Sequence, residues 1–236
     1  MELNYDFMIQ SFGLVLQGIP VTIALTAVSL VAAAPFAFLL ALARIYKLRF
    51  FDKVAAVYIS FVRGTPMILQ ILVVYTLVPS FLNYLAKSAT IPVNVFAINP
   101  IIYAYIVFTL NTIALLAEIF RSALLSVDNG QIEAGLAIGL TSRQVYSKIV
   151  MPQALVSAVP NMCNITVNLL KNTSLAFLMT VKDVTAEGRI AASYGYNYIE
   201  AYIDVFIVYI ILCTIVQVSF ELAEKYIGSY RQLRRE

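Results

Sequence analysis

The sequence contains no histidine, only two cysteines and few charged residues. Histidine is the commonest metal ligand and general base in proteins, so without it most metal sites and acid–base mechanisms lose their usual residue. Charged residues make up 12% of the 236 residues, whereas soluble domains carry about 25%. With 61% hydrophobic residues, the chain has too few polar side chains to cover a water-facing surface. We therefore expect it to lie in a lipid bilayer.

Other missing features narrow the range of functions. The nine glycines form no phosphate-binding loop of the type G-x-x-x-x-G-K-[ST], so any ATP should be handled by another chain. Basic residues do not alternate with aromatic ones outside the short tail, which argues against nucleic acid as a partner. Cys163 and Cys213 both lie in apolar stretches, where a free thiol behaves as a small hydrophobe. We expect no structural disulfide.

Long uncharged windows predict the membrane helices. A helix that crosses the hydrocarbon core needs about 20 predominantly apolar residues. The windows lack the alternating polar and apolar pattern of a transmembrane barrel. We therefore predict an all-α integral membrane protein of one domain, residues 1–236, with five transmembrane helices. The expected spans are about 13–43, 54–86, 98–119, 151–171 and 201–224.

Lys and Arg residues concentrate on alternate sides of the predicted spans. The first loop, the third loop and the C-terminal tail hold most of them, whereas the second and fourth loops hold few. Because loops rich in Lys and Arg stay in the cytoplasm, we expect the N-terminus outside and the C-terminus in the cytoplasm. The residues assigned to the cytoplasmic side are Arg44, Lys47, Arg49, Lys53, Arg121, Arg143, Lys148, Lys225, Arg231, Arg234 and Arg235.

The predicted third loop, about residues 121–150, is the longest cytoplasmic segment and carries two helix-start signals. Asp128 and Thr141 each stand three positions before a glutamine, which is the spacing of a capping box. We therefore predict two short helices, with Gly139 ending the first. Pro152 follows where the chain re-enters the membrane.

The first loop helix, expected over residues 131–138, suits either of two roles. Its small residues Ala134, Gly135 and Ala137 would let another protein approach the backbone closely. The alternative is an amphipathic helix that lies on the lipid surface. These residues taken alone leave both roles open.

The same loop carries a resemblance to a known family. Glu133-Ala134-Gly135, followed by Gly139, Ile149 and Pro152, resembles the EAA loop of ABC importer permeases, whose pattern is E-A-A, three residues, G, nine residues, I, two residues, P. The spacing matches throughout. The one departure is glycine at the third position, which keeps a small residue there.

Three further segments resemble the polar amino-acid branch of that family, and the segments around Met67–Asn83 and Leu155–Leu175 are most similar to permeases of cystine importers. The branch-like segments are Arg63-Gly64-Thr65-Pro66, Ala117-Glu118-Ile119 with Arg121, and Lys171 with Thr173-Ser174-Leu175.

The resemblance implies a type I ABC importer transmembrane domain in the bacterial cytoplasmic (inner) membrane. Two permease chains, either two copies or two relatives, would form the pathway, and an extracellular or periplasmic binding protein would deliver the amino acid. Two ATP-binding subunits would use ATP and Mg, so this chain would be a non-catalytic subunit that binds no cofactor. The residues implied in coupling to those subunits are Glu133, Ala134, Gly135, Gly139 and Pro152.

Arg63 lies inside a predicted span, where a charge is unfavourable unless it is paired or faces water. Gly64 permits a break, Thr65 is a good N-cap and Pro66 a good first helical residue. A new helix should therefore begin at membrane depth, with its free N–H groups toward a cavity that could hold a substrate carboxylate. Gln70 joins Arg63 and Thr65 as a candidate substrate-binding residue. Alternatively, Arg63 only neutralises Glu118 or a group of carbonyls.

Two other polar groups fall in or near spans. Asn161, Asn164 and Asn168 recur at helical spacing, so their amides should share one stripe that lines either the cavity or a contact between chains. Lys171 and Ser174 follow at the outer end of that span. They could help to close the cavity, or Lys171 could simply extend toward the interface beside a polar exit loop.

Glu118 and Arg121 are three residues apart at the cytoplasmic end of the third predicted span. They should share a helix face and pair with each other, which assigns them a gate-stabilising or structural role.

The leading hypothesis is the permease subunit of an ATP-driven importer for a polar amino acid, with L-cystine or a related zwitterion as cargo. Its carboxylate would lie near the Arg63 turn and its ammonium group near the asparagine stripe. An ion-coupled carrier or a channel that needs no ATPase is the alternative. An intramembrane enzyme is disfavoured because no spacing assembles a nucleophile with a base.

Overall fold

The computed structural model describes residues 3–89 and 94–232, with side chains as far as Ile227. Helices make up most of these residues, and the described ranges contain no β-strand. Arg234 and Arg235, which contributed to the predicted orientation, lie outside the described residues. The longer helices are α1 (Tyr5–Leu16), α2 (Ile19–Ile45), α3 (Arg49–Gly64), α4 (Met67–Ser88), α5 (Pro100–Leu125), α8 (Met151–Asn172) and α10 (Tyr198–Gln232).

Shorter elements complete the chain. A 3₁₀ turn, η1 (Val95–Ala97), precedes α5, and the predicted third loop contains α6 (Asn129–Ala137) and α7 (Ser142–Val145). A π-helical turn, η2 (Tyr146–Val150), joins α7 to α8, and a 3₁₀ segment, η3 (Thr173–Met179), follows α8. Helix α9 (Val184–Ser193) then leads into α10.

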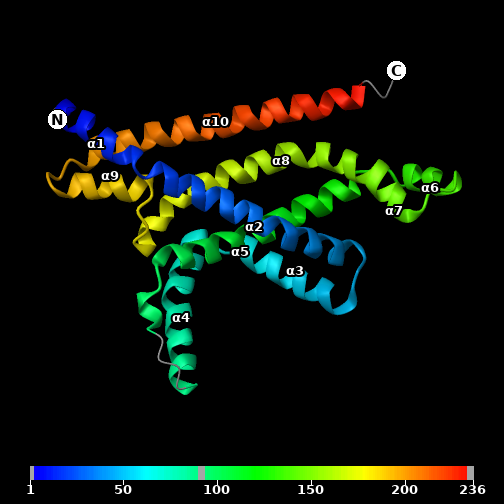
Figure 1. The fold of residues 1–236 in the computed structure, drawn as a ribbon, viewed down its shortest axis with the longest axis horizontal. Coiled ribbons are helices and arrows are strands. Elements are labelled where there is room, and N and C mark those ends of the chain that lie inside the picture. Colours follow the sequence, from blue (N-terminus) through cyan, green and yellow to red (C-terminus); the bar gives the residue numbers. More distant parts are fainter. Residues whose placement is uncertain (1–2, 90–93, 233–236) are drawn as a thin grey trace.

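The long helices α2, α5, α8 and α10 run along the length of the molecule, while α4 extends away from them to one side (Figure 1). Helices α6 and α7 form one end of the molecule, and α9 lies at the other end beside the start of α10. The predicted second span, 54–86, is therefore two helices, α3 and α4, that meet at a sharp turn.

Small side chains allow α2 and α5 to pack closely. Ala33 and Ala37 of α2 are fully buried against a cluster that contains Ala114 and Ala117 of α5. Small residues let helix backbones approach each other and increase van der Waals contact, the main attraction between helices in lipid. The extensive α2–α5 contact forms the centre of the bundle.

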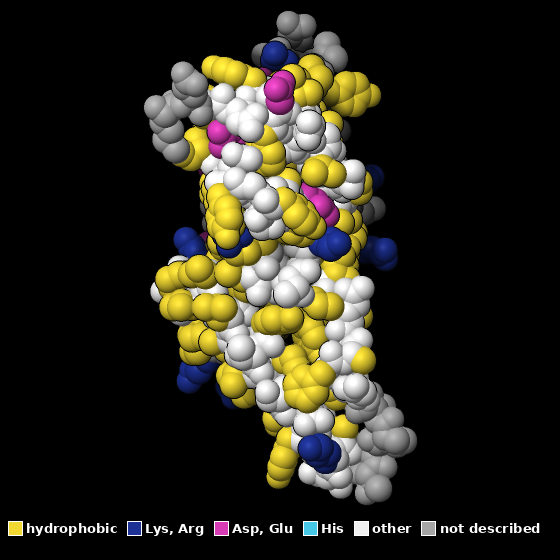
Figure 2. Space-filling view, turned by 90° about the vertical axis from the view of Figure 1, so that its left-hand side faces the viewer, with side chains coloured by type: hydrophobic (Ala, Val, Ile, Leu, Met, Phe, Trp, Pro, Cys, Tyr) yellow, Lys and Arg dark blue, Asp and Glu magenta, His cyan; other side chains and the backbone are white. Residues whose placement is uncertain are grey.

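Four described segments are long and apolar enough to cross a membrane, namely Tyr5–Ile45, Met67–Ser88, Pro100–Leu125 and Tyr198–Ile227. Many of their large hydrophobic side chains are exposed, and Figure 2 shows apolar side chains over much of one face with charged ones scattered between them. Helix α8 occupies the range of the predicted fourth span but is not among these segments. Its asparagines lower its hydropathy, so length and apolarity support four of the five expected spans.

A buried carboxylate organises the junction before α9. Asp183 caps α9 by accepting hydrogen bonds from the backbone N–H groups of Thr185 and Ala186, each at 3.0 Å. The Tyr209 hydroxyl of α10 donates to the same carboxylate at 3.1 Å. Burial raises the pKa of Asp183 from its ordinary value of 3.8, and these hydrogen bonds oppose the shift.

Candidate functional site

The turn between α3 and α4 differs from the predicted geometry. Thr65 is extended, with φ −117° and ψ 139°, and Pro66 occupies the N-cap position, so α4 begins at Met67. The Thr65 hydroxyl donates to the carbonyl of Phe61 at 2.9 Å and thus completes the end of α3. Our prediction of Thr65 as N-cap and Pro66 as first helical residue was wrong, because Pro66 is itself extended, with φ −61° and ψ 137°, so α4 begins one residue later.

Gln70 holds this turn in place. Its amide nitrogen donates to the carbonyl of Val62 at 2.9 Å and to the Thr65 hydroxyl at 2.9 Å. Its amide oxygen accepts a hydrogen bond of 2.9 Å from the buried side chain of Asn111 on α5. Both ends of the Gln70 amide are therefore engaged within the chain. We had not singled out Asn111, although it is a polar residue in an otherwise apolar window.

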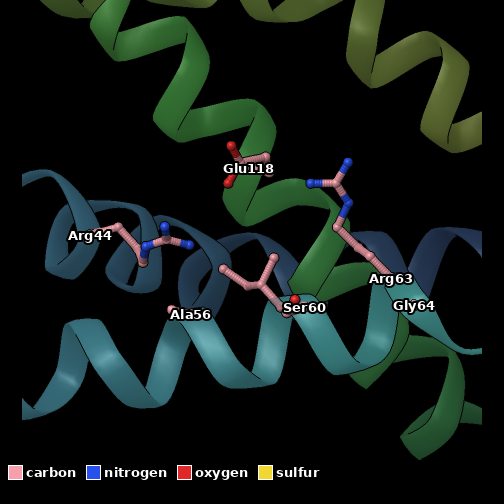
Figure 3. A pocket seen from close by; sticks show the side chains of 7 residues that line it. Arg44, Ala56, Ser60, Arg63, Gly64 and Glu118 are labelled. Atoms are coloured by element: carbon pink, nitrogen blue, oxygen red, sulfur yellow. The ribbon is translucent and has the colours of Figure 1, made fainter.

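Arg63 faces an open pocket of about 520 Å³ between α2, α3 and α5. The charged side chains of Arg44 and Glu118 converge on the same space, with Ser60 below them on α3 (Figure 3). Arg63 forms no ion pair with any residue that the structure describes. The alternative in which Arg63 pairs with Glu118 is therefore absent from this conformation. The lining residues are Arg44, Ala56, Ile59, Ser60, Arg63, Gly64 and Glu118.

Glu118 and Arg121 form the ion pair that their spacing predicts. The Arg121 Nε donates to Glu118 Oε1 at 3.1 Å and to Oε2 at 3.2 Å, and Nη2 also donates to Oε1. On the neighbouring helices, Arg44 pairs with Asp52 at 3.1 Å, which joins the end of α2 to the start of α3. The pairs fix the charged side chains around the pocket. The predicted gate role of Glu118 and Arg121 stays a prediction.

Asn161, Asn164 and Asn168 share one exposed stripe of α8. Within the described chain, none of their side-chain amides forms a hydrogen bond. Amides that face lipid without partners are unfavourable, so the stripe needs water or another chain beside it. The pocket at Arg63 does not include this stripe. The two halves of the predicted substrate site are therefore not brought together in this chain.

The end of α8 places the remaining candidates differently. Lys171 is exposed and Ser174 is half-buried. Thr173 is buried, and its hydroxyl donates to the Leu170 carbonyl at 2.7 Å and lies 3.3 Å from the Tyr209 hydroxyl. Thr173 thus connects the end of α8 to α10 and to the Asp183 junction.

The loop helices begin and end where the sequence indicates. Asp128 caps α6 by accepting a 2.6 Å hydrogen bond from the N–H of Gly130. Thr141 and Gln144 form the complete capping box of α7, with bonds of 3.3 and 2.8 Å. Gln131 does not return to Asp128 as a capping box requires, and instead accepts a 2.6 Å hydrogen bond from Gln153 of α8.

Gly139 ends α6, whereas Gly135 lies in a close packing contact within the loop. Gly139 has φ +85° and follows α6, and the Leu140 N–H bonds the Gly135 carbonyl at 3.1 Å, as in a Schellman motif. Gly135 is buried, and a Cβ there would lie 3.0 Å from both Val145 and Ile149. It packs against its own loop, so our expectation that Gly135 would lie open to another protein was wrong.

The outer face of α6 is exposed in the described chain. Glu133 and Ala134 are exposed, and Glu133 has no ion pair within the described residues. Leu136 is 45% and Ile138 78% exposed. Pro152 lies in the first turn of α8, directly after the π-helical turn. An acidic residue, a small residue and two apolar knobs thus form one exposed end of the molecule.

The arrangement of these helices defines a membrane permease of the type I ABC fold. It is similar to a chain in the crystal structure of an amino acid ABC transporter with histidines, with a TM-score of 0.81 at 24% sequence identity. The match covers 96% of this chain and 100% of that chain.

Residues 33–228 match the family described as binding-protein-dependent transport system inner membrane component, and the chain belongs to that family. It is 37% identical over 207 residues to the L-cystine transport system permease protein TcyL of Bacillus subtilis (strain 168), which covers 88% of this chain and 84% of TcyL. The probable amino-acid permease protein YxeN of the same organism is 35% identical over 223 residues, covering 94% and 95% of the two chains. The resemblance stated from the EAA-like loop is confirmed.

Proposed function

We propose that this chain is the transmembrane permease subunit of an ATP-binding-cassette importer for a polar amino acid, with L-cystine or a related zwitterion as its cargo. The family and the similarity to amino-acid permeases support the class of cargo. The similarity to TcyL supports cystine. The chain would cross a bacterial cytoplasmic membrane five times, with its N-terminus outside and its C-terminus inside, and α8 would be the fourth span in chain order.

The observation that carries the proposal is the exposed face of α6. A carboxylate, small residues and apolar side chains without partners in the described chain suit insertion into a groove of another protein. This chain would be non-catalytic and bind no cofactor. Two partner subunits would hydrolyse ATP with Mg, and their closure would draw the α6 helices of two permease chains together and shift the spans between inward-open and outward-open states.

Chain pairing follows from the stripe on α8. Its three unsatisfied amides need polar surroundings, which a second permease copy or relative would supply, either directly or by enclosing water. An external binding protein would deliver the amino acid, and Lys171 and Ser174 would help to close the outer side of the pathway.

The test is uptake in proteoliposomes that contain this chain, its candidate ATPase and its candidate binding protein. Radiolabelled cystine, arginine, glutamine and histidine are compared, and E133A is compared with E224A, which removes an exposed carboxylate from α10. We expect ATP-dependent uptake, lowered about tenfold in E133A and unchanged in E224A. Uptake by this chain alone would overturn the proposal in favour of an ion-coupled carrier or channel.

A further inference from the structure

Of the charged residues that line the pocket at Arg63, some form ion pairs within the described chain and one does not. Arg44 is held by Asp52 at 3.1 Å, and Glu118 is held by Arg121. Arg63 alone among the three charged lining residues has no ion pair within the described chain. Its guanidinium presents five N–H donors in a planar fork that matches a carboxylate. The pocket therefore offers one unpaired cation to a ligand.

Glu118 and Ser60 provide unused hydrogen-bond capacity beside that cation. Two Arg121 nitrogens reach Glu118 Oε1, whereas Oε2 accepts only the 3.2 Å bond from Nε. A carboxylate has about four acceptor positions, so Oε2 can still accept from a cationic donor. The Ser60 hydroxyl lies in the same pocket without a hydrogen bond in the described chain.

The rest of the pocket suits a small organic molecule better than a simple anion. Its volume of about 520 Å³ lies within the range of about 300–1,000 Å³ typical of small-molecule sites. Ala56, Ile59 and Gly64 supply an apolar or open wall. A phosphate or an anionic lipid headgroup would be repelled by Glu118, whereas a zwitterion places its two charges against two opposite charges of the protein.

We propose that this pocket recognises the backbone of an amino acid, with Arg63 binding the α-carboxylate and Glu118, assisted by Ser60, binding the α-ammonium group. This inference rests on the proposed function. It replaces the asparagine stripe of α8 as the partner of the ammonium group, because that stripe does not line the pocket. The cargo's side chain would then extend away from Arg63 and Glu118.

Equilibrium binding of radiolabelled cystine, arginine, glutamine and histidine to the purified permease–ATPase complex, without the binding protein, tests the site. For whichever amino acid binds, we expect E118Q to weaken binding by about tenfold or more, equivalent to about 1.4 kcal/mol. Wild-type protein should also reject the des-amino analogue, which is 3,3′-dithiodipropionate for cystine. E118Q should lose that discrimination.

R121Q is the matched control, because it removes the same ion pair but keeps the carboxylate. A binding role for Glu118 predicts affinity retained or increased in R121Q, whereas a purely structural role predicts equal losses in R121Q and E118Q. S60A removes a hydroxyl that makes no hydrogen bond in the described chain, so it keeps the test valid if E118Q fails to assemble. It should weaken binding severalfold without affecting assembly.

The outcomes separate this site from the proposed function. If wild-type uptake depends on the ATPase but E118Q still rejects the des-amino analogue, the proposed amino-acid site is wrong and the proposed transport function stands. Uptake with no measurable binding of any of the four amino acids would also overturn the pocket. Failure of ATP-dependent uptake with every amino acid would contradict the function itself.

Discussion

A Cβ atom on Gly18 would lie 2.3 Å from the backbone nitrogen of Val184, although the two residues are far apart in the sequence. The contact is with backbone atoms, which cannot move aside as a flexible side chain can. Gly18 also precedes α2, and the Val184 N–H donates to the Thr22 hydroxyl in the first turn of that helix at 3.3 Å. The start of α2 and the start of α9 are thus joined at a site that only glycine fits.

Replacing Gly18 should therefore destabilise the protein. We expect G18A to lower the free energy of unfolding by about 1–3 kcal/mol, the usual cost of overpacking. G13A is the matched control, because a Cβ at Gly13 in α1 would meet nothing within 4 Å and alanine favours a helix. Thermal unfolding in detergent measures both. A stable G18A would contradict the close approach.

Ser29 carries a buried hydroxyl for which the described chain provides no hydrogen-bond partner. Because an unsatisfied buried donor is unfavourable, S29A should leave the unfolding free energy unchanged or raise it by about 1 kcal/mol. T26V is the comparison, since the buried Thr26 hydroxyl donates to the Thr22 carbonyl at 2.9 Å. A larger loss of stability in S29A than in T26V would contradict the assignment of this hydroxyl as unsatisfied.

Gln70 and Asn111 should be energetically coupled. In Q70L or N111L, the remaining amide loses its side-chain partner, so each single change should destabilise the turn between α3 and α4. The double variant should lose less than the sum of the two, with an interaction energy of about 1 kcal/mol. Chemical or thermal unfolding of the four proteins gives this value. Additive effects would mean that the 2.9 Å hydrogen bond does not link the helices.

Asp183 should make stability depend on pH. Burial raises its folded pKa above the ordinary value of 3.8, so the folded state keeps the proton longer than the unfolded state. Its contribution to stability is therefore lost as the pH rises through the window that begins near 3.8 and ends at the raised folded pKa. D183N keeps the shape and stays neutral. The difference in melting temperature between wild type and D183N should shift in favour of D183N across that window.

Buried carboxylates elsewhere titrate in both proteins, so the comparison isolates Asp183. A difference in melting temperature that is constant with pH would contradict the raised pKa.

The sequence predictions that succeeded depended on residues close together in the chain. The capping box at Thr141 and the turn at Gly139 depend on neighbouring residues and backbone geometry, and both are present. The stripe of Asn161, Asn164 and Asn168 follows from helical periodicity and is exposed as a unit. The ends of the loop helices and the shared face of the three asparagines were therefore accessible from the chain alone.

Apart from the turn at Thr65 and Pro66, the failures arose at residues whose surroundings come from segments elsewhere in the chain. No residue near Gly18 in the sequence indicates its close contact with Val184. The burial of Asp183 depends on Tyr209 of α10. The sequence suggests that Gly135 is open to a partner, but Val145 and Ile149 of the same loop pack against it. Asn111 is one polar residue in an apolar window, and its hydrogen bond to Gln70 at the α3–α4 turn is seen only in the structure.

The join between the loop and α8 has a mechanical consequence. Gln131 of α6 is bonded to Gln153 of α8, Gly135 is wedged against Val145 and Ile149, and α7 continues into α8 through the π-helical turn. These connections join α6 and α7 to the start of α8, so the three helices should move together. At about 1.5 Å per residue, the 22 residues of α8 extend about 33 Å. A tilt imposed at α6 would therefore appear, amplified by that length, at the opposite end near Lys171.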